Sequence, residues 1–126
     1  MPGQSQRPAR AAAQLRQEIA RQISRELGDP RLDGLVVSSV SMTPDLRLAR
    51  IMWRLADSSL PGVDLEARKK DAAKALEKSS GRLRKAVTAR LGLRYAPELR
   101  FQYDEGLDAR DRIEQLLHEV KKERGE

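Results

Sequence analysis

The sequence predicts an α+β domain in which helices pack on one face of a three-stranded sheet. The observation behind it is that apolar residues recur every three or four positions in some segments and every second position in others. These segments follow one another as helix, strand, strand, helix–kink–helix, strand and helix. The 126 residues are 39% hydrophobic and 35% charged, which suits one compact domain with a modest core.

The first half of the chain predicts a helix followed by a β-hairpin. Residues 1–8 are polar with two prolines, and we expect a disordered tail there. Residues 9–27 carry a single apolar stripe, which predicts an amphipathic helix that ends at Gly28. Residues 35–42 and 48–55 alternate as two strands, joined by a Thr-Pro-Asp turn.

Strict alternation predicts which strand residues share a face. Val36, Val40 and Met42 should lie on one face of the first strand, and Leu35 and Val37 on the other. On the second strand the predicted inward face is Ala49, Ile51, Trp53 and Leu55.

The second half predicts a kinked helix pair, a third strand and a last helix. Asp64 can cap a helix that runs to about Ser79, and the helical pattern resumes after Gly81 as far as Leu91. Two serines and a glycine at this point favour a kink. Residues 99–103 alternate as a strand, and residues 113–120 carry a helical stripe. Residues 121–126 form a short charged tail, so the expected domain spans 9–120.

Positive charge is concentrated in one part of the chain. Segment 67–100 holds eleven of the 25 basic residues and three of the 19 acidic ones, in a protein of net charge +6. Such polarity favours a polyanionic partner, although a solvated helix face is the simpler interpretation.

The kink is the expected centre of this charge. Backbone N–H groups at Gly81 and Arg82 would form a new helix N-terminus, and the missing Cβ of Gly81 would let a phosphate approach. An ordinary corner between two helices is the alternative. The candidate RNA-binding residues are Lys70, Lys74, Lys78, Ser79, Ser80, Gly81, Arg82, Arg84, Lys85, Arg90 and Arg94. Tyr95, beside Arg94, is a candidate for stacking on a base, whereas Trp53 and Tyr103 are expected in the core.

Most enzyme chemistry has no support in the composition. The chain has no cysteine and one histidine, which excludes disulfides, thiol catalysis and two-histidine metal motifs. It has no glycine-rich phosphate loop, no apolar run that could span a membrane and no secretory signal near its start. His118 is expected on a helix surface, and the acidic residues at 104–111 at a helix start. We therefore expect no catalysis, no cofactor and no metal.

Several segments together resemble one family. They are D-P-R-L at 29–32, S-M-T-P-D-L-R at 41–47, A-L-E-K-S-S-G-R-L-R at 75–84, L-G-L-R-Y-A-P-E-L-R-F-Q-Y-D at 91–104 and R-I-E-Q-L-L at 112–117. Each is weak alone, but their order and spacing resemble the bacterial ribosome-binding factor A family over residues 9–120.

The resemblance implies a KH-like domain of type II topology and a role that is not enzymatic. It implies a cytoplasmic, monomeric factor that binds 16S rRNA and free 30S subunits or their precursors. Late maturation, processing of the 16S rRNA 5′ end and cold adaptation are implied with it. The family has an Ala-X-Gly kink in place of the phosphate-clamping loop; here Ser79, Ser80 and Gly81 occupy it, with serine in place of alanine. Gly-x-x-Gly is absent, which argues against a KH domain that reads single-stranded RNA sequence.

Two other functions stay open from the residues. One is a general RNA or DNA chaperone with no ribosomal role. The other is a protein–protein adaptor that uses an exposed sheet face near Leu35, Val37, Leu48 and Met52.

Overall fold

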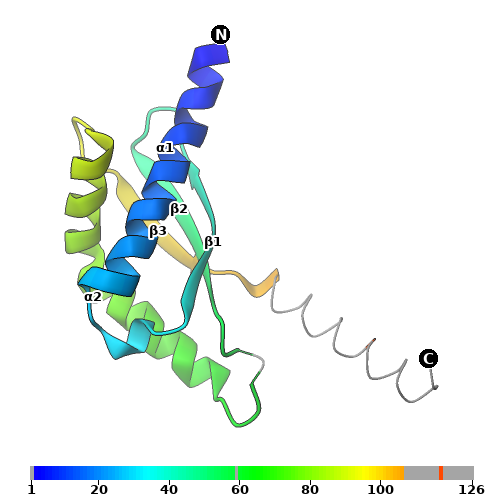
Figure 1. Ribbon diagram of the computed structural model, residues 1–126. Helices are drawn as coiled ribbons and strands as arrows, with labels where there is room; N and C mark the ends of the chain where they lie inside the picture. The colour runs from blue at the N-terminus through cyan, green and yellow to red at the C-terminus, as the bar shows by residue number, and fades with distance from the viewer. Residues whose placement is uncertain (1, 59, 107–116, 118–126) are drawn as a thin grey trace.

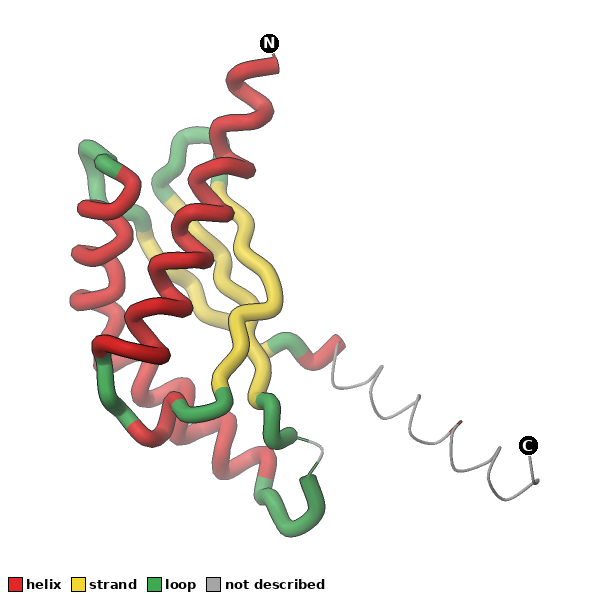
Figure 2. Tube along the Cα trace, viewed as in Figure 1, coloured by secondary structure: helices red, strands yellow, loops and turns green. Residues whose placement is uncertain are grey.

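Two helices cover one face of a three-stranded sheet in a computed structural model that describes residues 2–58, 60–106 and 117 (Figure 1). The elements are α1 (Pro2–Arg21), a π-helical turn η1 (Gln22–Glu26), a 3-10 turn η2 (Pro30–Leu32), β1 (Leu35–Met42), β2 (Leu48–Leu55), α2 (Leu65–Leu91) and β3 (Glu98–Tyr103). Figure 2 shows both helices on the same side of the strands. The predicted α+β class is confirmed.

The sheet is mixed, with strand order β1-β2-β3. β1 and β2 pair antiparallel, as the predicted hairpin requires, with Leu35 opposite Leu55 and Met42 opposite Ala49. β2 and β3 pair parallel, so the chain must cross the sheet between them, and α2 makes that crossing. The predicted inward face of β2 is confirmed, because Ala49, Ile51, Trp53 and Leu55 are all buried.

The predicted faces of β1 are wrong in one respect. The register with β2 shifts between Val37 and Ser39, so Ser38 sits in a bulge and the alternation changes phase there. As a result Leu35, Val37, Val40 and Met42 all contact the core, whereas Val36 is 38% exposed.

The bulge also creates contacts that hold it. Arg16 of α1 donates from Nη2 to the Val37 carbonyl at 3.0 Å, and Ser38 Oγ donates to Asp104 Oδ2 at 2.8 Å. Because Leu35 and Val37 face the core, they cannot share the adaptor surface expected with Leu48 and Met52, which lie on the opposite face of β2 from Ile51.

Helix α1 begins at Pro2, earlier than the sequence predicts. Segment 1–8 is expected as a disordered tail, but from residue 2 the structure places it in the helix. Pro2 takes the first helical position, where no N–H partner is needed, and Pro8 removes only one helical hydrogen bond. Leu15 and Ile19 are fully buried against the sheet, and Gly28 follows η1 with a positive φ of 62°.

The predicted change of direction near Gly81 is present, but the helix is not interrupted there. Helix α2 runs without a break from Leu65 to Leu91, although Figure 1 shows that its axis changes direction between the green and yellow-green parts. Residues inside a continuous helix donate their N–H groups to carbonyls one turn earlier. The expected free helix N-terminus at Gly81 and Arg82 is therefore not present.

The predicted last helix at 113–120 and the tail at 121–126 lie outside the described residues, apart from Leu117. His118 also lies outside them, as do Asp108 and Asp111 of the expected acidic group.

Candidate nucleic-acid interface

Helix α2 is the element that positions most of the candidate residues, and both of its ends are capped. The Asp64 carboxylate accepts a hydrogen bond from the Ala67 N–H at 3.2 Å, as predicted for an N-cap. At the other end Gly92 adopts φ 64°, a left-handed conformation that glycine allows without strain. Ala72, Leu76, Leu83 and Val87 are buried, so the opposite side of the helix faces solvent.

Four lysines form a row on that solvent side. Lys70, Lys74, Lys78 and Lys85 are all exposed, and we call them the lysine stripe. Lys70, Lys74 and Lys78 follow one another at four-residue steps, and Gly81 bridges the gap to Lys85 at steps of three and four. Residues at these spacings lie on one face of a helix. Within the described part of the chain none of the four makes a hydrogen bond or ion pair, although the charge of Lys78 helps to lower the pKa of Asp29 and Lys70 lines a groove beside β3.

Gly81 lies within this row. A Cβ built there would meet no atom within 4 Å, so nothing in the fold requires the side chain to be absent. The surface at this point is therefore open, and Gly81 and Lys85 line one side of a groove.

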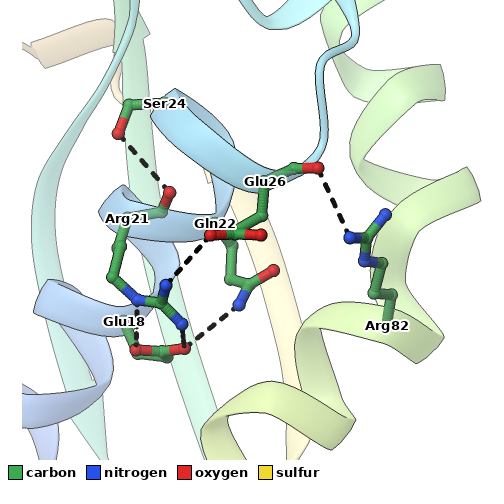
Figure 3. Close-up of polar contacts among 6 residues, drawn as sticks. All are labelled: Glu18, Arg21, Gln22, Ser24, Glu26 and Arg82. Atoms are coloured by element: carbon green, nitrogen blue, oxygen red, sulfur yellow. Dashed lines mark hydrogen bonds and ion pairs between the residues drawn. The ribbon is translucent and has the colours of Figure 1, made fainter.

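Two candidate arginines are engaged inside the fold instead. Arg82 donates from Nη2 to the Glu26 carbonyl at 3.3 Å and so links α2 to the turn after α1 (Figure 3). Arg84 donates from Nε to the Pro97 carbonyl at 2.9 Å and from Nη2 to the Ala96 carbonyl at 3.3 Å. Both remain exposed and cationic, but they point away from the stripe, to either side of the helix.

Arg90 lies on the side of α2 that faces α1. It lines a hollow of about 750 Å³ together with Glu18, Arg21 and Gln22. Hydrogen bonds from Arg21 and then Gln22 lower the pKa of the buried Glu18 below its usual 4.5, and the charge of Arg90 contributes (Figure 3). Arg90 therefore belongs to the contact between the helices.

The two serines of the expected kink are not part of the stripe. Ser79 and Ser80 are half-buried, whereas the four lysines are exposed; Ser80 and Lys70 both line a groove of about 890 Å³ between α2 and β3. Of the expected residues, the structure thus brings together the four lysines and Gly81.

Two basic residues at the start of α2 stabilise the fold. Arg68 pairs with Asp57 at 3.0 Å and donates to the carbonyls of Arg31 and Asp33. Lys69 lies 4.4 Å from the centre of the Tyr103 ring and pairs with Glu66 and Glu105. Tyr103 in turn meets Trp53 edge-on at 5.0 Å, and both pack in the core as predicted.

Arg94 lies in the loop after α2, beside the exposed ring of Tyr95. Its guanidinium carbon is 5.5 Å from the centre of that ring, and the guanidinium carbon of Arg47 is 5.0 Å from it. The Arg-Tyr pair in the sequence points to Arg94 and Tyr95. Nothing in the sequence points to Arg47, because it comes from the distant β1–β2 turn.

Other kinds of site find no support among the described residues. Over 2–58, 60–106 and 117 no group of three or more histidine, cysteine or acidic side chains is placed to hold a metal ion. Within the same ranges no helix is both long and apolar enough to cross a membrane.

The family model for ribosome-binding factor A matches residues 7–117. The chain belongs to the ribosome-binding factor A family. It is 43% identical to the ribosome-binding factor A of Sorangium cellulosum, over 96% of this chain and 94% of the relative. It is 34% identical to that of Desulforamulus reducens, over 92% of this chain and 91% of the relative.

Two solved structures support the same assignment. The crystal structure of ribosome-binding factor A from Thermus thermophilus matches with a TM-score of 0.60 and 28% identity, over 76% of this chain and 94% of that one. A solution NMR structure of a Thermotoga maritima protein assigned to the family matches with a TM-score of 0.61 and 26% identity, over 76% and 85%.

Proposed function

We propose that this protein is a ribosome assembly factor that binds the small (30S) ribosomal subunit or its precursor through the lysine stripe of α2. The observation that carries the proposal is the row itself: four exposed lysines on one helix face, none of which forms an ion pair among the described residues, although the charge of Lys78 reaches Asp29. Asp71 and Glu77 lie between these lysines in the sequence, but within the described residues neither forms an ion pair with them, unlike the acids of a salt-bridged helix. The chain belongs to a family named for ribosome binding, and for this reason we take the ribosome as the partner.

The mechanism that we infer is positional. Lysines are compact cations that neutralise phosphates without reading bases, so they supply affinity, while the folded shape of the RNA supplies specificity. The factor would hold neighbouring segments of 16S rRNA in an intermediate arrangement until late maturation and processing of the 5′ end are complete. No catalytic group is needed for this role, and it would operate in the cytoplasm, where the subunits are assembled.

The expected KH-like domain of type II topology, over residues 9–120, belongs to the same proposal. Its support is the element order α1-β1-β2-α2-β3, with β3 parallel to β2 across the bent helix.

Cosedimentation with purified 30S subunits tests the proposal. Lys74→Glu with Lys78→Glu should weaken binding by at least about tenfold, because two phosphate contacts are replaced by repulsion. The matched control is Arg10→Glu with Arg25→Glu, which makes the same charge change at exposed arginines of α1 and η1. The control should bind nearly as wild type, and both variants should keep the thermal unfolding midpoint of the wild type.

Equal losses in the two double variants would overturn the lysine stripe as the site, because net charge alone would then explain the binding. Wild-type affinity in Lys74→Glu/Lys78→Glu would have the same consequence.

A further inference from the structure

We propose that Tyr95, with Arg47 and Arg94, is a stacking site for one unpaired RNA base next to the lysine stripe. This deepens the proposed function and rests on it, since it assigns to the same RNA partner a contact that the stripe cannot make. The stripe can meet only phosphates, whereas an exposed aromatic ring offers a flat apolar surface to a base.

The first observation is the exposure of the ring. Tyr95 is 56% exposed, one of four large hydrophobic residues that are strongly exposed within the described part of the chain. Tyr103, the other tyrosine, packs instead against Trp53. An aromatic ring left on the surface of a small domain forgoes the free energy of burial, which a stacked base would recover.

The second observation is the pair of guanidinium groups at the ring. Arg47 and Arg94 reach it from two different loops, with their guanidinium carbons 5.0 and 5.5 Å from the ring centre. Both groups lie over the ring and are attracted to it, so a base that stacks on Tyr95 displaces one of them, and the displaced guanidinium can pair bidentately with a phosphate. The site therefore offers the Tyr95 ring to the base of a nucleotide and a guanidinium group to its phosphate.

The third observation is that both loops are fixed. The Glu98 N–H donates to the Arg47 carbonyl at 2.8 Å and so joins the β1–β2 turn to the start of β3. Arg84 holds the carbonyls of Ala96 and Pro97, and Pro97 is fully buried. A site held in this way loses little conformational entropy when a ligand binds.

A groove of about 730 Å³ runs from the stripe as far as Ala96, the residue after Tyr95. Its lining includes Gly81, Lys85 and Ala96, together with the small residues Thr88, Ala89 and Gly92. Gly81 and Lys85 belong to the face of the stripe, and Ala96 follows Tyr95 directly. Its small side chains leave room for a sugar–phosphate backbone to pass from the stripe to the ring.

Asp45 neutralises the site only in part, because its carboxylate interacts with the charge of Arg47 but is hydrogen-bonded within the turn. Asp45 turns its carboxylate to the backbone N–H of Arg47 at 3.1 Å and to Thr43 Oγ1 at 2.6 Å. It therefore caps the turn, and the Arg47 guanidinium makes no ion pair among the described residues. Glu98, which also lies near Arg47, pairs with Arg100 at 3.3 Å, so the two arginines leave the site positively charged and it favours an anionic ligand over an apolar one.

Stacking on a single ring reads no sequence, because every base has a π-face. We therefore expect unpaired RNA of any composition to bind, and we expect a fully paired duplex to make only phosphate contacts. This difference gives the site a signature that charge alone cannot imitate.

The test compares two ring variants on two RNA probes. Tyr95→Leu removes the aromatic face and Tyr95→Phe keeps it; both residues are compatible with an exposed loop position. The probes are a 12-nucleotide oligouridylate and a 12-base-pair RNA duplex, titrated at one fixed salt concentration. We expect Tyr95→Leu to weaken oligouridylate binding by about 5- to 150-fold and duplex binding hardly at all, with Tyr95→Phe close to wild type on both.

The outcomes separate this inference from the proposed function. Wild-type affinity of Tyr95→Leu for oligouridylate would overturn the stacking site, and so would equal losses on both probes. Lys74→Glu/Lys78→Glu should weaken both probes alike, and that result does not depend on Tyr95. A failure of the lysine variants on 30S subunits would overturn the proposed function, whatever the ring variants show.

Discussion

Asp29 is the residue whose charge is most strongly tied to the fold. Its Oδ1 accepts from the Arg31 backbone N–H at 3.0 Å and from Arg31 Nε at 3.1 Å, while Oδ2 accepts from Arg31 Nη2 at 2.8 Å. These bonds, with that from the Arg31 side chain the largest cause, lower the pKa of Asp29 from 3.8 to about 2. The pair closes the turn between α1 and β1, because Asp29 is also the N-cap of η2.

This pKa predicts how stability depends on acid. A carboxyl group with a lowered folded-state pKa stabilises the fold above its unfolded pKa, here about pH 4, and loses that contribution as the pH falls toward 2. Asp29→Asn keeps an oxygen for the cap but not the charge. We expect it to be less stable than wild type at pH 6, with the two converging between pH 4 and 2, measured by urea unfolding. A constant difference down to pH 2 would contradict the charge as its source.

At the scale of the elements, α2 shows what packing can override. A glycine in a helix interior costs about 0.5–1 kcal/mol relative to alanine, and the preceding serines add a little more. Burial of Leu76, Leu83 and Val87 on the other face exceeds that cost, so the helix continues through Gly81 and only bends. The Ser-Ser-Gly segment therefore correctly indicates that the helix axis changes direction, but it wrongly indicates that the helix is interrupted.

Gly81→Ala measures this balance directly. A Cβ at this position enters open space, so we expect the substitution to stabilise the protein by about 0.5–1 kcal/mol through helix propensity. The reverse change at an exposed position of the same helix, Ala73→Gly, should destabilise it by a similar amount. Thermal unfolding measures both. A lower midpoint in Gly81→Ala would mean that the bend needs the backbone freedom of glycine.

The strands show where local patterns suffice and where they fail. The alternation of 48–55 gives both the bounds and the buried face of β2, because each apolar residue there packs directly against the helices. In β1 the inward and outward positions exchange at Ser38 and Ser39, and two polar residues give no hydrophobic signal of that exchange. The bulge depends on the register with β2 and on distant groups such as Arg16 and Asp104.

The candidate site divides in the same way. The lysine stripe follows from spacing on one helix, so the sequence predicts its members. Arg82, Arg84 and Arg90 instead contact other parts of the fold. These contacts depend on where α1 and the loop before β3 pack, and residue spacing within one helix does not reveal that. The partnership of Arg47 with Tyr95 depends on the sheet, because β2 and β3 become neighbours only after α2 has crossed it.

At the scale of the whole molecule, the fold separates two uses of positive charge. Arginines such as Arg16, Arg68 and Arg82 donate to backbone carbonyls between elements and stabilise the packing. The lysines of the stripe make no such bonds among the described residues, and they lie on the side of α2 opposite its buried residues. The cationic surface is thus rigid in its backbone while each lysine head remains hydrated, which favours contact with many phosphates over one fixed pairing.

Salt dependence of binding tests this division quantitatively. Each lysine that neutralises a phosphate releases condensed counterions, so log K for 30S subunits should fall against log salt with a slope of about −3 to −5. Lys74→Gln should make that slope shallower by about 0.7–0.9, whereas Arg68→Gln should lower the unfolding midpoint and leave the slope unchanged. Tyr95→Leu should also leave it unchanged, because stacking releases no counterions. A slope near zero in the wild type, measured by cosedimentation over 50–300 mM KCl, would show that phosphates do not provide the affinity and that the stripe is only a solvated helix face.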